Sequence, residues 1–271
     1  MEGTRATSRV TVITVVKNHA PAVEETIASV AAQIHQPLEH LVVDGASADG
    51  TLDVLKRHGA GIRWVSGPDR GLYDAMNKGI ALVDDPERYI IFLNAGDTFH
   101  DPEATAQVLA RSNGEDFLYG RLERLDETDG DRDVIGGEVG AQDLLYGMRC
   151  HHQTIFCRRR IFDRIGGFRL EYRIAADYDW VVRAFRASEI SRLFVPVTVS
   201  TMKRGGLSEH GYLQGIRERR KIVRESYSRG DAARFLAYSL FGDYLMWGVQ
   251  RVLRPLGLIP LVRKIRRAAR A

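Results

Sequence analysis

A short run of β-branched residues near the start of the chain constrains the fold more than any other feature. Residues Val10 to Val16 read VTVITVV. An unbroken apolar run of this length is typical of a strand that is buried on both faces. Such strands belong to parallel sheets with helices on both sides. The segments that follow must therefore supply more strands and the helices that cover them.

The next segments alternate between helix and strand patterns. Apolar residues first recur at spacings of four, three and four, which predicts a helix with one buried stripe made of Val23, Ile27, Val30 and Ile34. Three strands follow, at His40–Val43, Ile62–Val65 and Tyr89–Leu93. Two helices separate them, at Thr51–Arg57 and Asp74–Val83. This alternation predicts an α/β fold with a Rossmann-like, mainly parallel sheet flanked by helices.

The second half of the chain is less regular. We expect three more strands, at Asp116–Tyr119, Gln153–Arg158 and Arg192–Val199. A helix is predicted at Tyr178–Ala187, and the acidic stretch Asp126–Asp133 is predicted to form a hairpin tip or loop. A chain of 271 residues with 44% hydrophobic content is sufficient for one large core.

Polar residues follow the strands of the first half. Ligands of parallel sheets bind beyond the carboxyl ends of the strands, and the residues there are Lys17, Asn18, Asp44, Asp69, Arg70, Asn94 and Asp97. Carboxylates with a cation fit a nucleoside diphosphate bound through a divalent metal, because two sets of anionic oxygens need a hard cation between them. We expect Asp97 to be the metal ligand, with a turn-capping role as the open alternative.

Two of these residues have an alternative role besides binding the nucleotide. Asp44 would accept a hydrogen bond from an N–H of a uracil-type base, but an aspartate in Asp-Gly-x-Ser can also cap its own turn. Arg70 would offset phosphate charge, and the alternative is an ordinary surface arginine.

Four ordered motifs carry a resemblance to a known family. They are TVVKN at 14–18, VVDGASADGT at 42–51, SGPDRGLYDAMNKG at 66–79 and FLNAGD at 92–97. Together they resemble the family 2 glycosyltransferases, in particular the bacterial branch that builds polysaccharides and glycolipids. The similarity covers roughly residues 10–210 and is more specific than a lone short pattern.

The resemblance implies a GT-A fold and an inverting transfer of a sugar from an NDP-sugar (UDP-, dTDP- or GDP-linked) to an acceptor hydroxyl, with Mg²⁺ or Mn²⁺. It implies that the nucleoside is held by Thr14, Val15, Lys17, Asn18 and Asp44. Asp69 and Arg70 would border the diphosphate, and Asp97 would be the metal aspartate. Many members carry Asp-x-Asp-Asp where this chain has Asn94-Ala95-Gly96-Asp97, so Asn94 offers only an amide oxygen and we expect weak metal binding without donor.

The acceptor side of the site is predicted in the second half. The segment AADYDW at 175–180 resembles the family's acceptor stretch, in which one aspartate removes the acceptor proton. We favour Asp177 over Asp179 as this base, and Asp179 is then an acceptor-side residue; the alternative for Asp177 is a helix N-cap. His151 and His152 would line the acceptor site or be hydrogen-bonded strand-edge residues.

The resemblance divides the chain into a catalytic domain at 1–210, with a nucleotide-binding half at about 10–100 and an acceptor-binding half at about 101–210, and a helical basic appendage at 211–271. The loop Gly205-Gly206-Leu207-Ser208 would close over the donor or be an ordinary turn. His210 is a conceivable third metal ligand or an exposed histidine.

The basic charge of the chain is confined to its end. Seven basic residues and no acidic one lie between Arg251 and Ala271, so residues 1–250 carry a net −3 although the whole chain carries +4. This distribution argues against nucleic-acid binding and suits an anionic lipid surface. The apolar segment Phe235–Val249 predicts either a helix lying in the membrane interface or one packed on the domain or on a second subunit, as in a homodimer.

Cys150 and Cys157 match no redox or metal pattern, and the polar start of the chain lacks an export signal. We therefore expect a reduced cytoplasmic protein, with the inner face of the cell membrane as the place for a lipid-bound C-terminal helix. Three other classes remain to be separated: a sugar nucleotidyltransferase, a Rossmann dehydrogenase and a non-catalytic sugar-nucleotide-binding protein. The first two normally carry a glycine-rich phosphate loop after the first strand, and residues 14–19 contain no glycine.

Overall fold

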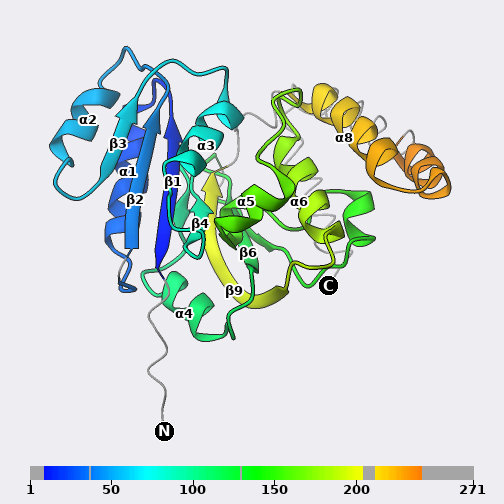
Figure 1. The fold of residues 1–271 in the computed structure, drawn as a ribbon. Helices are drawn as coiled ribbons and strands as arrows, with labels where there is room; N and C mark the ends of the chain where they lie inside the picture. The colour runs from blue at the N-terminus through cyan, green and yellow to red at the C-terminus, as the bar shows by residue number, and fades with distance from the viewer. Residues whose placement is uncertain (1–8, 37, 129, 204–210, 240–271) are drawn as a thin grey trace, which may run out of the picture.

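The computed structural model describes residues 9–36, 38–128, 130–203 and 211–239. A nine-stranded sheet forms its centre, with the spatial order β3-β2-β1-β4-β8-β6-β9-β5 and with β7 paired to β6 (Figure 1). The strands of the first half are β1 (Val10–Val16), β2 (Leu38–Asp44), β3 (Arg63–Ser66) and β4 (Tyr89–Phe92). Their helices are α1 (Ala20–Ala31), α2 (Thr51–Arg57) and α3 (Leu72–Ala81).

The first four strands in space pair in parallel, as the alternating pattern predicts. Every residue of β1 is buried, because helices cover both of its faces. Val42 packs with α1 and α2 in one apolar cluster, whereas its neighbour Val43 packs in another cluster with Tyr73 and Met76 of α3. Figure 1 shows α3 on the opposite side of the sheet from α1 and α2. The α/β fold is therefore confirmed.

Strand register aligns the ends of three strands. Val16 of β1 lies opposite Asp44 of β2, and Asp44 lies opposite Ser66 of β3. The loops after these strands consequently begin at the same edge of the sheet. This edge is the place where a ligand of a parallel sheet is expected.

One residue of the predicted α1 stripe is placed differently. Val23, Ile27 and Val30 are buried, but Ile34 is 61% exposed. The helix ends at Ala31, so Ile34 lies beyond the last turn and no longer follows the helical period. The prediction that Ile34 belongs to the buried stripe is wrong.

The second half mixes parallel and antiparallel pairing. Its elements are β5 (Thr98–Phe99), α4 (Ala104–Ala110), β6 (Phe117–Leu125), β7 (Arg132–Ile135), β8 (Ile155–Arg158), α5 (Arg160–Ile165), α6 (Ala176–Arg186) and β9 (Arg192–Lys203), with short 3-10 helices at Asp143–Tyr146 and His152–Thr154. The twelve-residue β9 runs parallel to β6, and the register shifts at Gly120. A Cβ on Gly120 would lie 2.6 Å from the Val197 carbonyl, so only glycine fits there.

The predicted hairpin is present between β6 and β7, which pair antiparallel around the acidic stretch. Asp126 itself is buried, and its Oδ1 accepts hydrogen bonds from the amide and hydroxyl of Thr128. The hairpin extends the sheet beyond β6.

Helix α6 closes the core of the second half. Trp180, Val181, Ala184 and Phe185 are all buried, as its amphipathic pattern predicts. The Trp180 ring stacks on Phe162 of α5, with 4.6 Å between the ring centroids. The start of α6 is thereby fixed against α5.

Helix α8 (Tyr212–Ser226) and a helix over residues 229–239 follow β9. Ile222, Val223 and Phe235 of these helices belong to the same apolar cluster as α3 and α6. The described start of the segment predicted as an appendage therefore packs on the domain (Figure 1). Residues 240–271, with most of the helix proposed for a membrane or subunit contact, lie outside the described residues. Within the described part of the chain, no helix is long and apolar enough to cross a membrane.

Cys150 and Cys157 are buried free thiols, as predicted. Burial raises the pKa of both thiols well above the usual range. They are consequently inert packing residues.

Candidate active site

Asp44 ends β2 with one carboxylate oxygen occupied and one free. Its Oδ2 accepts hydrogen bonds from the Ser47 amide (3.0 Å) and the Ser66 hydroxyl (2.6 Å), so the turn-capping role is real. Its Oδ1 is buried and has no hydrogen-bond partner among the described residues. A buried acceptor without a partner is costly and calls for a donor. An N–H of a nucleoside base would supply one.

The loop after β1 is tied to the loop after β2 by Asn18. The Asn18 amide donates to Ser47 Oγ (2.8 Å), and its side-chain oxygen accepts from the Ala48 amide (2.8 Å). Asn18 adopts a positive φ of 52°, a conformation that asparagine tolerates better than most residues. Lys17 beside it is exposed. The structure thus brings Lys17 and Asn18 together with the Asp44 loop.

Asp69 approaches the same loop from β3. A Cβ on Gly45 would overlap the Asp69 carboxylate, so the close approach requires glycine at position 45. Asp69 Oδ1 accepts the Gly71 amide at 2.8 Å, which orients the carboxylate. Arg70 is largely exposed, and its guanidinium lies 3.1 Å from Asp74. Asp69 therefore lies against the Asp44 loop, and a place next to a diphosphate stays a prediction for both Asp69 and Arg70.

Asp74, on α3, anchors this segment. It accepts hydrogen bonds from the amide and guanidinium of Arg70 and pairs with Lys78 at 3.0 Å. The Arg70 amide, followed by Lys78, lowers the pKa of Asp74 to about 2. The carboxylate is accordingly ionised in the folded protein.

Thr14 and Val15 lie inside the sheet rather than at its edge. Thr14 is completely buried, and its Oγ1 shares a 2.9 Å hydrogen bond with His40 Nε2. Val15 is 4% exposed and packs in the core beneath α3. Their side chains support the strand, and a direct contact to the nucleoside stays a prediction for both.

The turn from Asn94 to Asp97 is held by main-chain contacts and by Thr26 of α1. Thr26 Oγ1 accepts the Gly96 amide (3.0 Å) and donates to the Asp97 carbonyl (2.9 Å). The Asp97 amide donates to the Asn94 carbonyl. The carboxylate of Asp97 is therefore not needed to cap its own turn. Thr26 was not singled out by the sequence, because it reads as an ordinary residue of an amphipathic helix.

Asp97 and Asn94 present the oxygens that a divalent cation would use. Burial raises the pKa of Asp97 to about 6, although the charge of His152 and a hydrogen bond from Gln153 act to lower it. Asn94 Oδ1 is buried and has no hydrogen-bond partner in the described chain. The described residues include no group of three His, Cys, Asp or Glu side chains suited to a metal. Because Mg²⁺ is commonly held by one or two carboxylates together with substrate phosphates, the pair fits a cation shared with a diphosphate.

His152 joins this turn to the predicted base. Its Nε2 lies 3.2 Å from Asn94 Nδ2, and its Nδ1 lies 3.1 Å from Asp177 Oδ2. The imidazole is only 14% exposed. Residues that stand 83 positions apart in the sequence, Asn94 and Asp177, are thus linked through one side chain.

Asp177 is the second residue of α6, and Ala175 occupies the N-cap position, so Asp177 is not the N-cap. Its Oδ1 accepts the Tyr178 amide (2.8 Å) and the Tyr73 hydroxyl (3.1 Å). Burial acts to raise the pKa of Asp177, but the hydrogen bond and charge of His152 together with these donors lower it below the ordinary value. Tyr73 lies within the motif at 66–79, but nothing in that motif discloses its partner.

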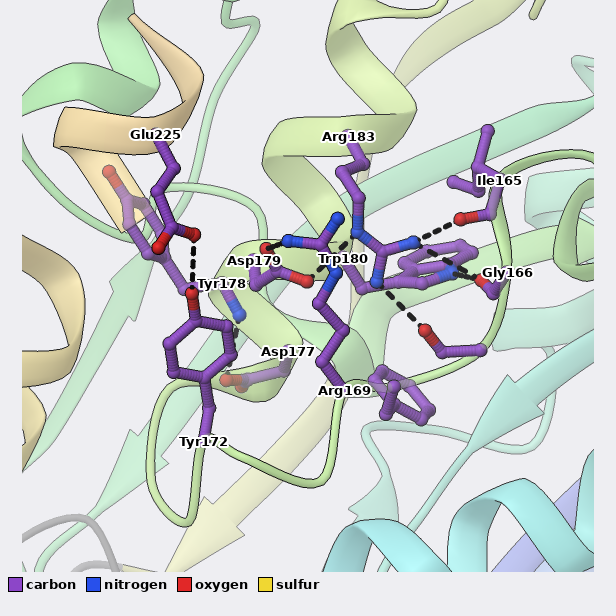
Figure 2. A network of polar contacts seen from close by, with 12 residues as sticks. Ile165, Gly166, Arg169, Tyr172, Asp177, Tyr178, Asp179, Trp180, Arg183 and Glu225 are labelled. Atoms are coloured by element: carbon purple, nitrogen blue, oxygen red, sulfur yellow. Dashed lines mark hydrogen bonds and ion pairs between the residues drawn. The ribbon is translucent and has the colours of Figure 1, made fainter. Parts of the chain in front are cut away.

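Asp179 has a different environment (Figure 2). It is 1% exposed and pairs with Arg183 at 2.8 Å and with Arg169 at 3.3 Å. Arg183 also donates to the carbonyls of Ile165, Gly166 and Gly167. Asp179 therefore fixes α6 to the loop after α5, and a contact of its carboxylate with an acceptor stays a prediction. Gly205-Gly206-Leu207-Ser208 and His210 lie outside the described residues.

Comparison with known proteins identifies relatives of this chain. The family model described as "Glycosyl transferase family 2" matches residues 11–178. A PGL/p-HBAD biosynthesis glycosyltransferase of Mycobacterium tuberculosis is 31% identical over 207 residues, which cover 70% of this chain and 75% of that protein. An uncharacterized glycosyltransferase of the same species is 34% identical over 197 residues, covering 70% and 71%.

Solved structures agree in fold. A mannosyltransferase from Pyrobaculum calidifontis, in complex with GDP-Man and Mn²⁺, has a TM-score of 0.65 at 16% identity and covers 98% of this chain and 80% of that one. S. aureus TarS 1–349 in complex with UDP-GlcNAc has a TM-score of 0.64 at 17% identity, covering 86% and 73%. The arrangement of the sheet is that of GT-A glycosyltransferases. The chain belongs to glycosyl transferase family 2.

Proposed function

We propose that the protein is an inverting, metal-assisted glycosyltransferase that uses an NDP-sugar donor. The observation that carries this proposal is the link through His152 between the Asn94–Asp97 turn and Asp177. A single displacement with inversion needs a base on one side of the anomeric carbon and a stabilised leaving group on the other. The two groups must therefore border one site, and the contacts of His152 with Asn94 and Asp177 support that arrangement.

The nucleoside would lie over the ends of β1, β2 and β3. Asp44 Oδ1, buried and without a partner among the described residues, would accept an N–H of the base. This contact needs a base that presents an N–H, as uracil and thymine do. Lys17 and Asn18 would border the same edge of the sheet, and Asp69 and Arg70 would lie near the diphosphate.

Asp97 and Asn94 Oδ1 would hold a Mg²⁺ or Mn²⁺ ion together with diphosphate oxygens. Such a cation supplies positive charge against the leaving diphosphate. With a single carboxylate in the turn, we expect the protein to bind the ion weakly until a donor is present. The complex of the Pyrobaculum calidifontis mannosyltransferase with Mn²⁺ supports this proposal.

Asp177 would take the proton from the acceptor hydroxyl as that oxygen attacks the sugar. Its lowered pKa keeps the carboxylate ionised and able to accept the proton. His152 and Tyr73 hold its two oxygens, so the carboxylate is oriented before the acceptor arrives. Positioned proton transfer contributes about 10² to 10⁴-fold in rate.

The acceptor is proposed to be a glycan or a lipid-linked molecule. A relative named for PGL/p-HBAD biosynthesis and the resemblance to the polysaccharide and glycolipid branch support this class. Tyr146 and Tyr238, both partly exposed and in edge-to-face contact, offer an apolar surface next to the second half. A peripheral membrane contact or a homodimer formed through residues beyond 239 remains part of the proposal.

Donor hydrolysis tests the function without knowledge of the acceptor. Purified protein is screened by thermal shift against UDP-, dTDP- and GDP-sugars with and without Mn²⁺, because a ligand at a hundred times its Kd stabilises by roughly 2.7 kcal/mol. The stabilising donor is then used to measure slow release of nucleoside diphosphate. We expect release to stop with EDTA and with Asp97→Ala. Release that is unaffected by both changes would remove the metal from the proposal.

A further inference from the structure

A buried carboxylate of α8 binds three consecutive main-chain amides outside its own helix. Glu218 is 9% exposed. Its Oε1 accepts the Arg173 amide at 3.0 Å, and its Oε2 accepts the amides of Ile174 and Ala175 at 2.9 Å each. Gln214, one turn earlier on α8, donates to Oε1 at 2.9 Å. Every contact that Glu218 makes to the three amides is therefore charge-assisted.

The three amides belong to the segment that leads directly to the proposed base. Residues 173–175 precede α6, and Asp177 is the second residue of that helix. The Ile174 carbonyl accepts the Tyr73 hydroxyl at 2.8 Å, and the same hydroxyl lies 3.1 Å from Asp177 Oδ1. Residue 174 is thus held by Glu218 through its amide and by Tyr73 through its carbonyl.

Packing alone does not require a carboxylate at this position. Ile222 and Val223 already bury the inner face of α8 in the main core. Burying an ionised group is costly unless hydrogen bonds compensate for lost hydration. Here the compensation comes from three amides of one short segment. The cost is therefore offset only if that segment stays in its present conformation, which couples α8 to the start of α6.

We propose that Glu218 is a positioning residue for Asp177, and that α8 is consequently part of the active-site scaffold. Glu218 acts through the 173–175 segment, which sets the position and direction of the first turn of α6. The inference rests on the proposed role of Asp177 as the base. It extends the functional machinery beyond residue 210 to a helix that the sequence assigns to an appendage.

The test compares full-length variants. Glu218→Gln keeps the volume of the side chain but leaves one oxygen where two now accept amides. A misplacement of about 1 Å can cost on the order of 10²-fold in rate. We therefore expect the kcat for nucleotide release to fall about 10- to 100-fold, while the donor Kd stays within about twofold of that of the unmodified protein. Hydrogen–deuterium exchange should become faster at residues 173–175. Asp177→Asn is measured beside it as the reference for loss of the base.

Two controls separate positioning from helix stability. Glu225→Gln changes a second glutamate of α8, which accepts the Tyr172 hydroxyl at 2.9 Å and binds none of the three amides (Figure 2). We expect it to keep normal kcat and normal exchange at 173–175. Ile222→Ala loosens α8 packing without removing the carboxylate, so it should lower Tm with a smaller loss of kcat than Glu218→Gln.

The outcomes distinguish a failure of the inference from a failure of the proposed function. Normal kcat in Glu218→Gln beside a collapsed Asp177→Asn overturns the inference and leaves the proposed function standing. A loss of kcat that follows Tm equally in Glu218→Gln and Ile222→Ala also overturns it, because the role is then structural. Normal turnover in Asp177→Asn removes the proposed base and the inference with it.

Discussion

His152 Nδ1 and Asp177 Oδ2 lie 3.1 Å apart, and the opposite nitrogen of the same ring reaches Asn94. The imidazole therefore connects the proposed metal turn with the proposed base, and both of its nitrogens are engaged. A histidine at the start of a strand would otherwise read as an edge residue. Its position brings residues from the two halves of the sequence together.

Asp177→Asn should retain donor binding while turnover falls about 10² to 10⁴-fold, the usual contribution of a positioned general base. The amide keeps the size of the side chain but cannot take up the acceptor proton. Donor Kd by calorimetry and nucleotide release under saturating donor measure the two quantities. Turnover close to that of the unmodified protein would exclude Asp177 as the base.

Asp179→Asn should act on stability instead. The carboxylate is buried between Arg169 and Arg183, and removing one member of a buried ion pair typically costs about 3 kcal/mol or more. Urea denaturation should show this loss in the free energy of unfolding, whereas Asp177→Asn should lose less. If Asp179→Asn kept full stability and lost acceptor binding, the acceptor role predicted from the sequence would be preferred.

Tyr73→Phe removes the hydroxyl that contacts both Ile174 and Asp177. A hydrogen bond to a charged group contributes about 1.5 kcal/mol or more, so we expect roughly a tenfold loss of kcat with little change in donor Kd. The ring remains packed against Phe168, which should preserve the fold. An unchanged kcat would show that Asp177 is oriented without Tyr73.

Gly45→Ala should weaken donor binding about tenfold or more. The added Cβ overlaps the Asp69 carboxylate, which must move away from the loop edge where the diphosphate is proposed to lie. Gly50→Ala is the matched control in the same loop, since its Cβ would meet Ala20 at an ordinary 3.7 Å. Equal donor affinity in the two variants would contradict the proposed place of the diphosphate.

His40 should make the fold sensitive to mild acid. Burial, with the charge of His58, lowers the pKa of His40 from 6.5 to about 3. Below pH 6.5 the unfolded chain takes up a proton that the folded protein does not. The free energy of unfolding therefore decreases as the pH is lowered, by about 1.5 kcal/mol between pH 6.5 and pH 5. His40→Gln should reduce this slope in urea titrations, and exposed His19→Gln should not.

The first half of the fold could be predicted because its signals are local. The β-branched run at Val10–Val16 and the polar residues after each strand identify the sheet edge without tertiary information. Ile34 was misplaced because apolar spacing does not mark the end of a helix. Asp44, Asp69 and Asp97 can be proposed as site residues because each lies in a recognisable motif at or shortly after the end of a strand.

The rest depends on contacts between distant segments. Glu218 lies 43 positions or more from the amides that it binds, and its surroundings on α8 read as a charged, solvated helix. Asp177 and Asp179 are two residues apart and chemically identical. Only the fold shows that Asp177 contacts His152 whereas Asp179 is paired with arginines. The spacing of apolar residues in the sequence cannot distinguish the two carboxylates.

The register that aligns Val16, Asp44 and Ser66 determines which side chains stand at the sheet edge where the donor is proposed to bind. Because neighbouring side chains of a strand face opposite ways, a slip of β2 by one position would turn the Asp44 carboxylate to the other face and bring Val43 to its place. An insertion or deletion near Leu38, at the opposite end of β2 from Asp44, would therefore abolish the proposed base recognition while leaving every side chain of the site present.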